Sequence, residues 1–130
     1  MNTEQINRIS GVVLDAAIKV HNGLGPGLLE SVYETVLAYE LRKRGHEVRT
    51  QVPIPVVWED VHLEAGFRAD LMVDEAVVVE IKSVEAVAPV HKKQVLTYLR
   101  LADKRVGLLI NFNVDLLKEG LTRIVNRLEG

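Results

Sequence analysis

Residues 77 to 83, VVVEIKS, constrain this chain more than any other stretch. Three consecutive valines followed by Ile81 are typical of a strand that is buried on both faces at the centre of a sheet. Side chains alternate along a strand, so Glu80 and Lys82 project from the same face, with Cα atoms roughly 6.6 Å apart. Burying either charge alone would cost free energy. The two residues therefore form an ion pair at the end of the strand, the commoner case for an isolated Glu-x-Lys, or they serve a function.

The spacing of apolar residues divides the chain into helices and strands, with no internal repeat and no linker between domains. It predicts, in chain order, helices over residues 3–22 and 28–44, strands over 46–58, 61–73 and 76–83, a helix over 89–102, a strand over 104–112 and a final helix over 116–128. The three consecutive strands should form an antiparallel meander, and the next strand should return parallel by a right-handed crossover. We therefore expect an α/β (α+β) fold, in which helices flank a mixed central sheet of about four strands. Pro53 and Pro55 place the first strand at an edge of this sheet.

The composition limits the class of protein. The chain has 130 residues, 48% of them apolar, which suits one globular domain over residues 1–130. It contains no cysteine, which excludes disulfides and thiolate metal sites. The first ten residues lack the pattern of a signal peptide and no apolar run could span a bilayer, so we expect a cytoplasmic protein without a membrane partner. A net charge of −2 neither requires nor excludes nucleic acid.

Asp70 is a second acidic residue inside a predicted strand, in the stretch FRADLMV. Aspartate is disfavoured there, and a short turn after residue 73 would bring its strand antiparallel beside Glu80. Two adjacent carboxylates repel each other unless a cation lies between them, and oxygen ligands favour hard ions such as Mg²⁺ or Mn²⁺. With the Ile81 carbonyl and Lys82, the two acids suit a hydrolytic metal centre in which lysine stabilises developing negative charge.

The third predicted helix carries Gln94 and Tyr98, which are four residues apart and so lie on one face. The first turn of this helix points toward the two carboxylates if the crossover is short. Taken alone, such a pair is more often a solvent-facing helix surface with one aromatic side chain at an interface.

These stretches resemble a known motif series. Asp70, EIK (residues 80–82) and QVLTY (residues 94–98) occur in the order found in the PD-(D/E)XK nuclease superfamily and resemble its RecB-like branch. GLLESVY (residues 27–33) is similar to the GxxExxY signature of a small family of uncharacterised prokaryotic proteins in that superfamily. The resemblance covers nearly the whole chain. Ala69 replaces the proline for which the superfamily is named, and this proline has no chemical role.

The resemblance implies a restriction-endonuclease-like core and a metal-dependent nuclease that hydrolyses phosphodiester bonds in DNA or RNA. It implies that Asp70 and Glu80 bind Mg²⁺ or Mn²⁺ and that Lys82 is the catalytic lysine. It also implies that Glu30, on the second helix, approaches the metal as an additional acidic group. The neutral side chains of Gln94 and Tyr98, on the third predicted helix, would orient water or phosphate.

Other interpretations stay open. GLGPG (residues 23–27) could bind phosphate in a nucleotide-binding regulator, but no strand precedes it, and a structural loop that directs the second helix is more common. The chain could also be a non-catalytic nucleic-acid-binding or protein-assembly module that retains the fold. A nuclease this small would be completed by forming a homodimer or by a partner protein that grips the nucleic acid. Trp58 is either a base-stacking platform or, more often, a packed or dimer-interface aromatic.

Overall fold

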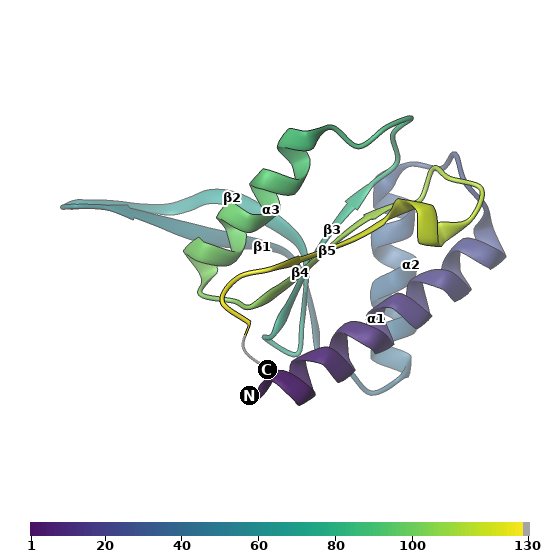
Figure 1. Ribbon diagram of the computed structural model, residues 1–130, viewed down its shortest axis with the longest axis horizontal. Coiled ribbons are helices and arrows are strands. Elements are labelled where there is room, and N and C mark those ends of the chain that lie inside the picture. Colours follow the sequence, from purple (N-terminus) through teal and green to yellow (C-terminus); the bar gives the residue numbers. More distant parts are fainter. Residues whose placement is uncertain (129–130) are drawn as a thin grey trace.

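The computed structural model describes residues 1–128 (Figure 1). In chain order its elements are α1 (Thr3–Leu24), α2 (Glu30–Lys43), β1 (Val48–Trp58), β2 (Val61–Val73), β3 (Val77–Lys82), α3 (Pro89–Ala102), β4 (Val106–Asn111), the 3₁₀ helix η1 (Leu117–Gly120) and β5 (Leu121–Val125). The domain expected over residues 1–130 includes residues 129 and 130, which lie outside the described part.

The strands form one sheet in the order β1-β2-β3-β4-β5. β3 and β4 are parallel and are joined by α3, whereas all other neighbours are antiparallel. This topology confirms the α/β (α+β) fold with a mixed sheet flanked by helices, as in a restriction-endonuclease-like core. The strand at residues 77–82 is central, and the strand that contains Pro53 and Pro55 is at an edge, as predicted.

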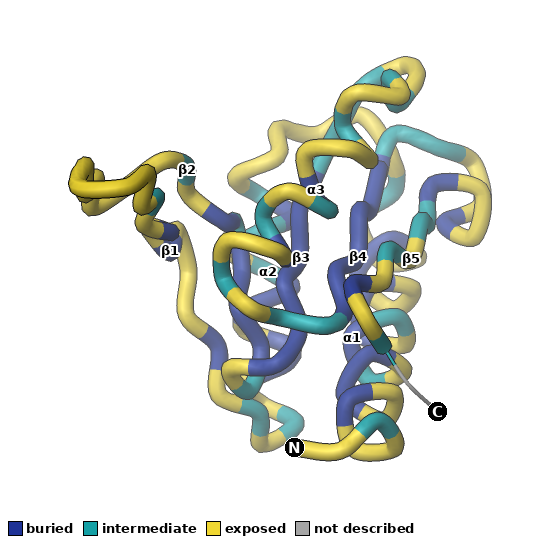
Figure 2. Tube along the Cα trace, turned by 60° about the vertical axis from the view of Figure 1, so that its left-hand side comes forward, coloured by how far each residue is buried: buried dark blue, intermediate teal, exposed yellow. Residues whose placement is uncertain are grey.

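Helices cover both faces of the sheet (Figure 1). Val77, Val79 and Ile81 of β3 belong to the core that α1 and α2 cover, while Val78 belongs to the smaller core beneath α3. Because side chains alternate, Glu80 projects toward the α3 side. Figure 2 shows β3 and β4 as the most continuously buried strands. None of the helices formed by residues 1–128 has the length and apolar character of a membrane span.

The final helix predicted over residues 116–128 is wrong. The chain instead forms η1 and then β5, which pairs antiparallel with β4 from Ile110↔Leu121 to Val106↔Val125. The reason is tertiary: β4 is buried along its whole length, so the N–H and C=O groups of its second edge need a strand partner. The sheet therefore has five strands rather than about four.

β1 and β2 continue beyond the rest of the sheet as a two-stranded arm (Figure 1). β2 pairs with β3 only from Leu71 to Val73, whereas β1 and β2 pair with each other as far as Trp58 and Val61. Figure 2 shows that the outer part of this arm is exposed. We call residues 54–67 the hairpin arm.

Candidate functional site

The side chains of Asp70 and Glu80 meet where β2 separates from β3. The antiparallel ladder ends at the pair Leu71↔Val79, so Asp70 and Glu80 occupy the next register position. The backbone N–H of Asp70 donates to Glu80 Oε1 over 3.1 Å, and the backbone N–H of Ile81 donates to Asp70 Oδ2 over 2.8 Å. Each carboxylate thus satisfies a backbone donor of the opposite strand.

Lys82 ends β3 and is half-buried, close to the two acids. No ion pair joins Glu80 and Lys82 within residues 1–128. Burial raises the pKa of both Asp70 and Glu80, and the positive charge of Lys82, acting at longer range, offsets part of this rise. The Ile81 side chain lies on the other face, in the core under α1 and α2. The strand therefore does not end in a simple ion pair.

Burial destabilises the charged form of both carboxyl groups. Burial, followed by the negative charge of Asp70, raises the pKa of Glu80 to about 8. Burial also raises the pKa of Asp70, although the hydrogen bond from the Ile81 N–H opposes this. The pair therefore carries fewer than two negative charges at neutral pH, and a cation bound between the two groups would favour full ionisation.

Helix α2 begins at Glu30, two residues later than the periodicity predicts, and brings two acids toward the site. Glu30 is exposed, and its Oε2 accepts a hydrogen bond from the Ser83 N–H over 3.1 Å. Glu34 is half-buried; burial raises its pKa, the Gln51 amide lowers it, and the charge of Asp70 raises it again. Glu34 was not among the residues predicted from the sequence. Its position one helical turn after Glu30 is the signal that would have indicated it.

Gln51 connects α2 to the strand pair. It stands opposite Asp70 in β1, and its Nε2 donates to Glu34 Oε1 over 2.5 Å and to Asp70 Oδ1 over 3.3 Å. Its φ of 50° lies in the left-handed region, which costs a non-glycine residue about 1–2 kcal/mol. Backbone strain of this kind persists where surrounding contacts enforce it, and it concentrates at functional sites. No feature of the sequence marks this glutamine.

Of the two predicted residues on α3, Tyr98 approaches the carboxylates. It is half-buried and stacks on Phe67, with ring centroids 3.4 Å apart. Burial raises the pKa of Tyr98, and the charges of Glu80 and Asp70 raise it further. Gln94 is exposed and makes no hydrogen bond with the residues that the structure describes. The catalytic roles of both residues stay predictions.

The donor atoms suit a hard divalent cation. Asp70 and Glu80 offer carboxylate oxygens, the ligands that Mg²⁺ and Mn²⁺ prefer, and burial, followed by neighbouring acidic charge, raises the pKa of both groups. However, no three side chains of His, Cys, Asp or Glu within residues 1–128 are grouped so as to hold a metal ion. The two acids therefore fit as a pair of ligands, and other ligands would come from backbone carbonyls, water or substrate.

A cavity of about 540 Å³ lies between the start of α2 and the segment that follows β3, and of the predicted site residues only Glu30 lines it. It is lined by Gly27, Leu28, Leu29, Glu30, Ser31, Ser83 and Asn113. Ser83 follows Lys82 directly, and its Oγ donates to the Leu28 carbonyl over 2.6 Å, so the loop between α1 and α2 forms one wall. The Tyr33 hydroxyl fixes this loop, since it donates to the Gly25 carbonyl over 2.6 Å and accepts from the Leu28 N–H over 3.1 Å. These bonds support a structural role for GLGPG.

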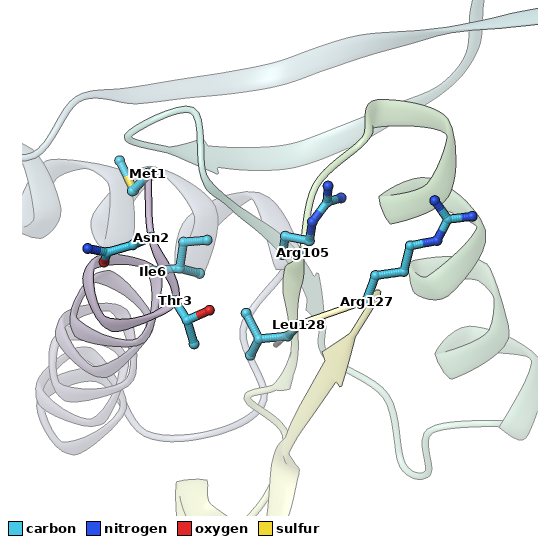
Figure 3. A pocket seen from close by; sticks show the side chains of 7 residues that line it. All are labelled: Met1, Asn2, Thr3, Ile6, Arg105, Arg127 and Leu128. Carbon is cyan, nitrogen blue, oxygen red and sulfur yellow. The ribbon is translucent and has the colours of Figure 1, made fainter. Parts of the chain in front are cut away.

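A second cavity, of about 440 Å³, lies at the opposite end of the sheet (Figure 3). Arg105 and Arg127 line it together with residues at the start of α1. Arg105 precedes β4, whereas Lys82 pairs with Asn111 at the other end of that strand. This cavity is therefore not part of the candidate site.

Replacing Glu80 with glutamine should change how stability depends on pH. The pKa of Glu80 is 4.5 when unperturbed and about 8 in the fold, so the folded state binds more protons between these values, and rising pH removes stability from the wild type. Glu80→Gln does not titrate there. Its advantage in the free energy of unfolding should grow by roughly 2–4 kcal/mol from about pH 5 to about pH 9. Urea denaturation in the presence of a chelator measures this, and parallel pH profiles would contradict it.

Two substitutions of Gln51 should differ in stability because of its backbone conformation. Both Gln51→Ala and Gln51→Gly remove the amide, but only glycine adopts a φ of 50° without steric cost. We expect Gln51→Gly to be more stable than Gln51→Ala by about 1 kcal/mol, measured by chemical denaturation. Equal stability of the two variants would show that the backbone is not strained at this position.

Comparison with known proteins identifies the superfamily of the chain. Residues 7–124, most of the chain, match the sequence profile of the PD-(D/E)XK nuclease superfamily. No curated protein and no solved structure gives a significant match. The matched segment contains β1 to β4 and most of β5, and so includes both Asp70 and Glu80. The chain therefore belongs to the PD-(D/E)XK nuclease superfamily.

Proposed function

We propose that the protein is a metal-dependent nuclease that hydrolyses phosphodiester bonds in DNA or RNA at the Asp70–Glu80 pair. The observation that carries this proposal is the reciprocal hydrogen bonding that holds the two carboxylates together beside Lys82. A buried acid with a pKa near 8 is costly to a fold, and such groups concentrate at functional sites. Membership of a nuclease superfamily supports the same reaction.

In this proposal, each residue from Asp70 and Glu80 to Lys82 has a separate role. Asp70 and Glu80 hold Mg²⁺ or Mn²⁺ through carboxylate oxygens, with the Ile81 carbonyl as a further ligand. The ion supplies an activated water and neutralises phosphate charge when it is bound. Lys82, which forms no ion pair within residues 1–128, stabilises the negative charge that develops on the phosphate.

The outer polar groups position water and substrate. Glu30 and Glu34 act as additional acids on the α2 side, where the cavity leaves room for a ligand. Tyr98 and Gln94 orient water or phosphate from α3. We also assign the chain to the GxxExxY group, and the support is the stretch at residues 27–33, whose tyrosine holds the loop that leads into α2.

In this proposal, binding of nucleic acid needs positive charge in addition to that of the chain. The chain has a net charge of −2, and phosphate binding generally depends on Lys and Arg. In this proposal the bound cation supplies part of that charge, and a second copy or a partner protein supplies the remainder.

A non-catalytic binding or assembly module is the second candidate. It is favoured by one observation, that no group of three acids or histidines within residues 1–128 is arranged around a metal position. In that case the only task of Asp70 and Glu80 would be to end the ladder between β2 and β3.

Mg²⁺ or Mn²⁺ should raise the melting temperature of the wild type by about 3 °C or more, because an ion that binds only the folded state stabilises it by mass action. The rise should be smaller in Asp70→Asn. That variant should also melt at the same or a higher temperature without metal, since it relieves repulsion with Glu80. Differential scanning fluorimetry measures both effects. Asp115→Asn, at an exposed aspartate, is the matched control, and an equal metal response in both variants would argue against the proposed ligands.

Lys82→Ala should keep the fold and most of the metal response but lose phosphodiester hydrolysis by about 100-fold or more. The carboxylates hold the ion, whereas lysine acts on the charge of the transition state, so its loss affects rate more than binding. The assay offers single-stranded and duplex DNA and RNA with Mg²⁺ or Mn²⁺, and Lys118→Ala, at an exposed lysine, is the control. Equal cleavage by wild type and Lys82→Ala would assign the activity to a contaminant.

A further inference from the structure

The hairpin arm carries one continuous apolar face. Val56 pairs with Leu63, and Trp58 pairs with Val61, across β1 and β2. Directly paired residues project from the same face of an antiparallel ladder, and residues two apart along a strand also share a face. These four side chains therefore form one surface, which we call the arm face.

The arm face has no partner in the described part of the chain. Trp58 is 70% exposed, and Val61 and Leu63 are each 54% exposed. None of the three belongs to the two buried clusters formed by residues 1–128. Figures 1 and 2 show the arm projecting away from the helices, with its outer part exposed. A two-stranded hairpin is only marginally stable alone in water, so an apolar face on it indicates a surface that another molecule covers.

The charged residues around the arm face are acidic. Glu59 and Asp60 form the exposed turn between β1 and β2 at the end of the arm face, whereas Glu64, also exposed, follows Leu63 and so projects from the opposite face. Between residues 56 and 66, His62 is the only residue that can carry a positive charge. Phosphate groups would be repelled here, which argues against nucleic acid as the ligand of this surface.

A second copy of the chain is no better match to the arm face than nucleic acid is. A symmetric contact between two arms would bring the same acids of both copies together. Backbone pairing between the outer edges of two β1 strands is also hindered, since Pro53 and Pro55 have no N–H to donate. An acidic surface with an apolar centre is complementary to a partner that presents apolar side chains between lysines or arginines.

We propose that the arm face docks a partner protein through a segment of this chemistry, with apolar side chains flanked by Lys and Arg. Trp58 is the anchor, because a large aromatic side chain that becomes fully desolvated contributes most to an interface. The turn carboxylates of Glu59 and Asp60 pair with the cations of the partner and make the affinity depend on salt. The arm face is separate from the Asp70–Glu80 pair, so the proposal does not rest on nuclease activity.

Trp58 is the only tryptophan of the chain, so its fluorescence reports directly on the arm. The probe is an amphipathic peptide of about 15 residues with leucines on one face and lysines beside them; a second peptide has glutamates in place of the lysines. Titrating the full-length protein with the lysine peptide should shift the Trp58 emission to shorter wavelength, with a Kd on the order of 10–100 µM. The affinity should fall about tenfold from about 50 to about 300 mM NaCl, and the glutamate peptide should not bind.

Variants separate the apolar contribution from the charged one. Leu63→Ser should weaken binding about tenfold or more, whereas Leu116→Ser should leave it unchanged. Both leucines are 54% exposed, but Leu116 lies just before η1 and outside the arm, which makes it a matched control. The combined variant Glu59→Gln and Asp60→Asn should weaken binding and remove its salt dependence, whereas Glu64→Gln, on the opposite face of the arm, should change both less. Thermal melting shows that each variant folds.

Three results would overturn the proposal: equal binding of the glutamate and lysine peptides, no binding of either, or equal binding by Leu63→Ser and Leu116→Ser. Sedimentation of the wild type as a dimer that Leu63→Ser dissociates would assign the arm face to a second copy instead. The same emission shift with DNA or RNA in place of the peptide would assign it to nucleic acid.

Discussion

Two hydrogen bonds between side chains and backbone determine where the common sheet ends and the hairpin arm begins. Just beyond the last ladder pair of β2 and β3, Asp70 and Glu80 each accept a backbone N–H of the opposite strand. β2 is therefore free to separate from β3 and to continue with β1 alone. The same bonds place two carboxyl groups side by side in a largely buried position, so the architecture and the chemistry of the site have one origin.

Neighbouring elements hold this acidic pair in place at a cost in folding free energy. Gln51 adopts a left-handed backbone conformation in the middle of β1, and its amide bonds both Asp70 and Glu34. Burial raises the pKa of Glu80 to about 8, so the charge is partly lost at neutral pH unless a cation is bound. A strained glutamine and crowded acids do not improve a fold. Their presence together is the pattern expected where function limits stability.

In both proposals, positive charge comes from outside the chain. We propose a divalent cation for the Asp70–Glu80 pair and a basic protein segment for the arm face, which is bordered by exposed acids. The chain has a net charge of −2, so it has no overall positive charge to attract phosphates. A basic partner bound at the arm would add such a surface near the place where β2 leaves the sheet, which fits the small size of the chain.

Local patterns were sufficient for most of the architecture and for the first candidates of the site. The buried strand at residues 77–82, the edge strand with its prolines and the superfamily motif series all depend on residue type and on spacing along the chain, which are visible without a structure. The last strand was not predictable in this way, because residues 121–125 pair only to complete the free edge of β4. Gln51 and Glu34 were also missed. They reach Asp70 from 19 and 36 positions away, and contacts between such distant residues arise only when the tertiary fold brings their backbones together.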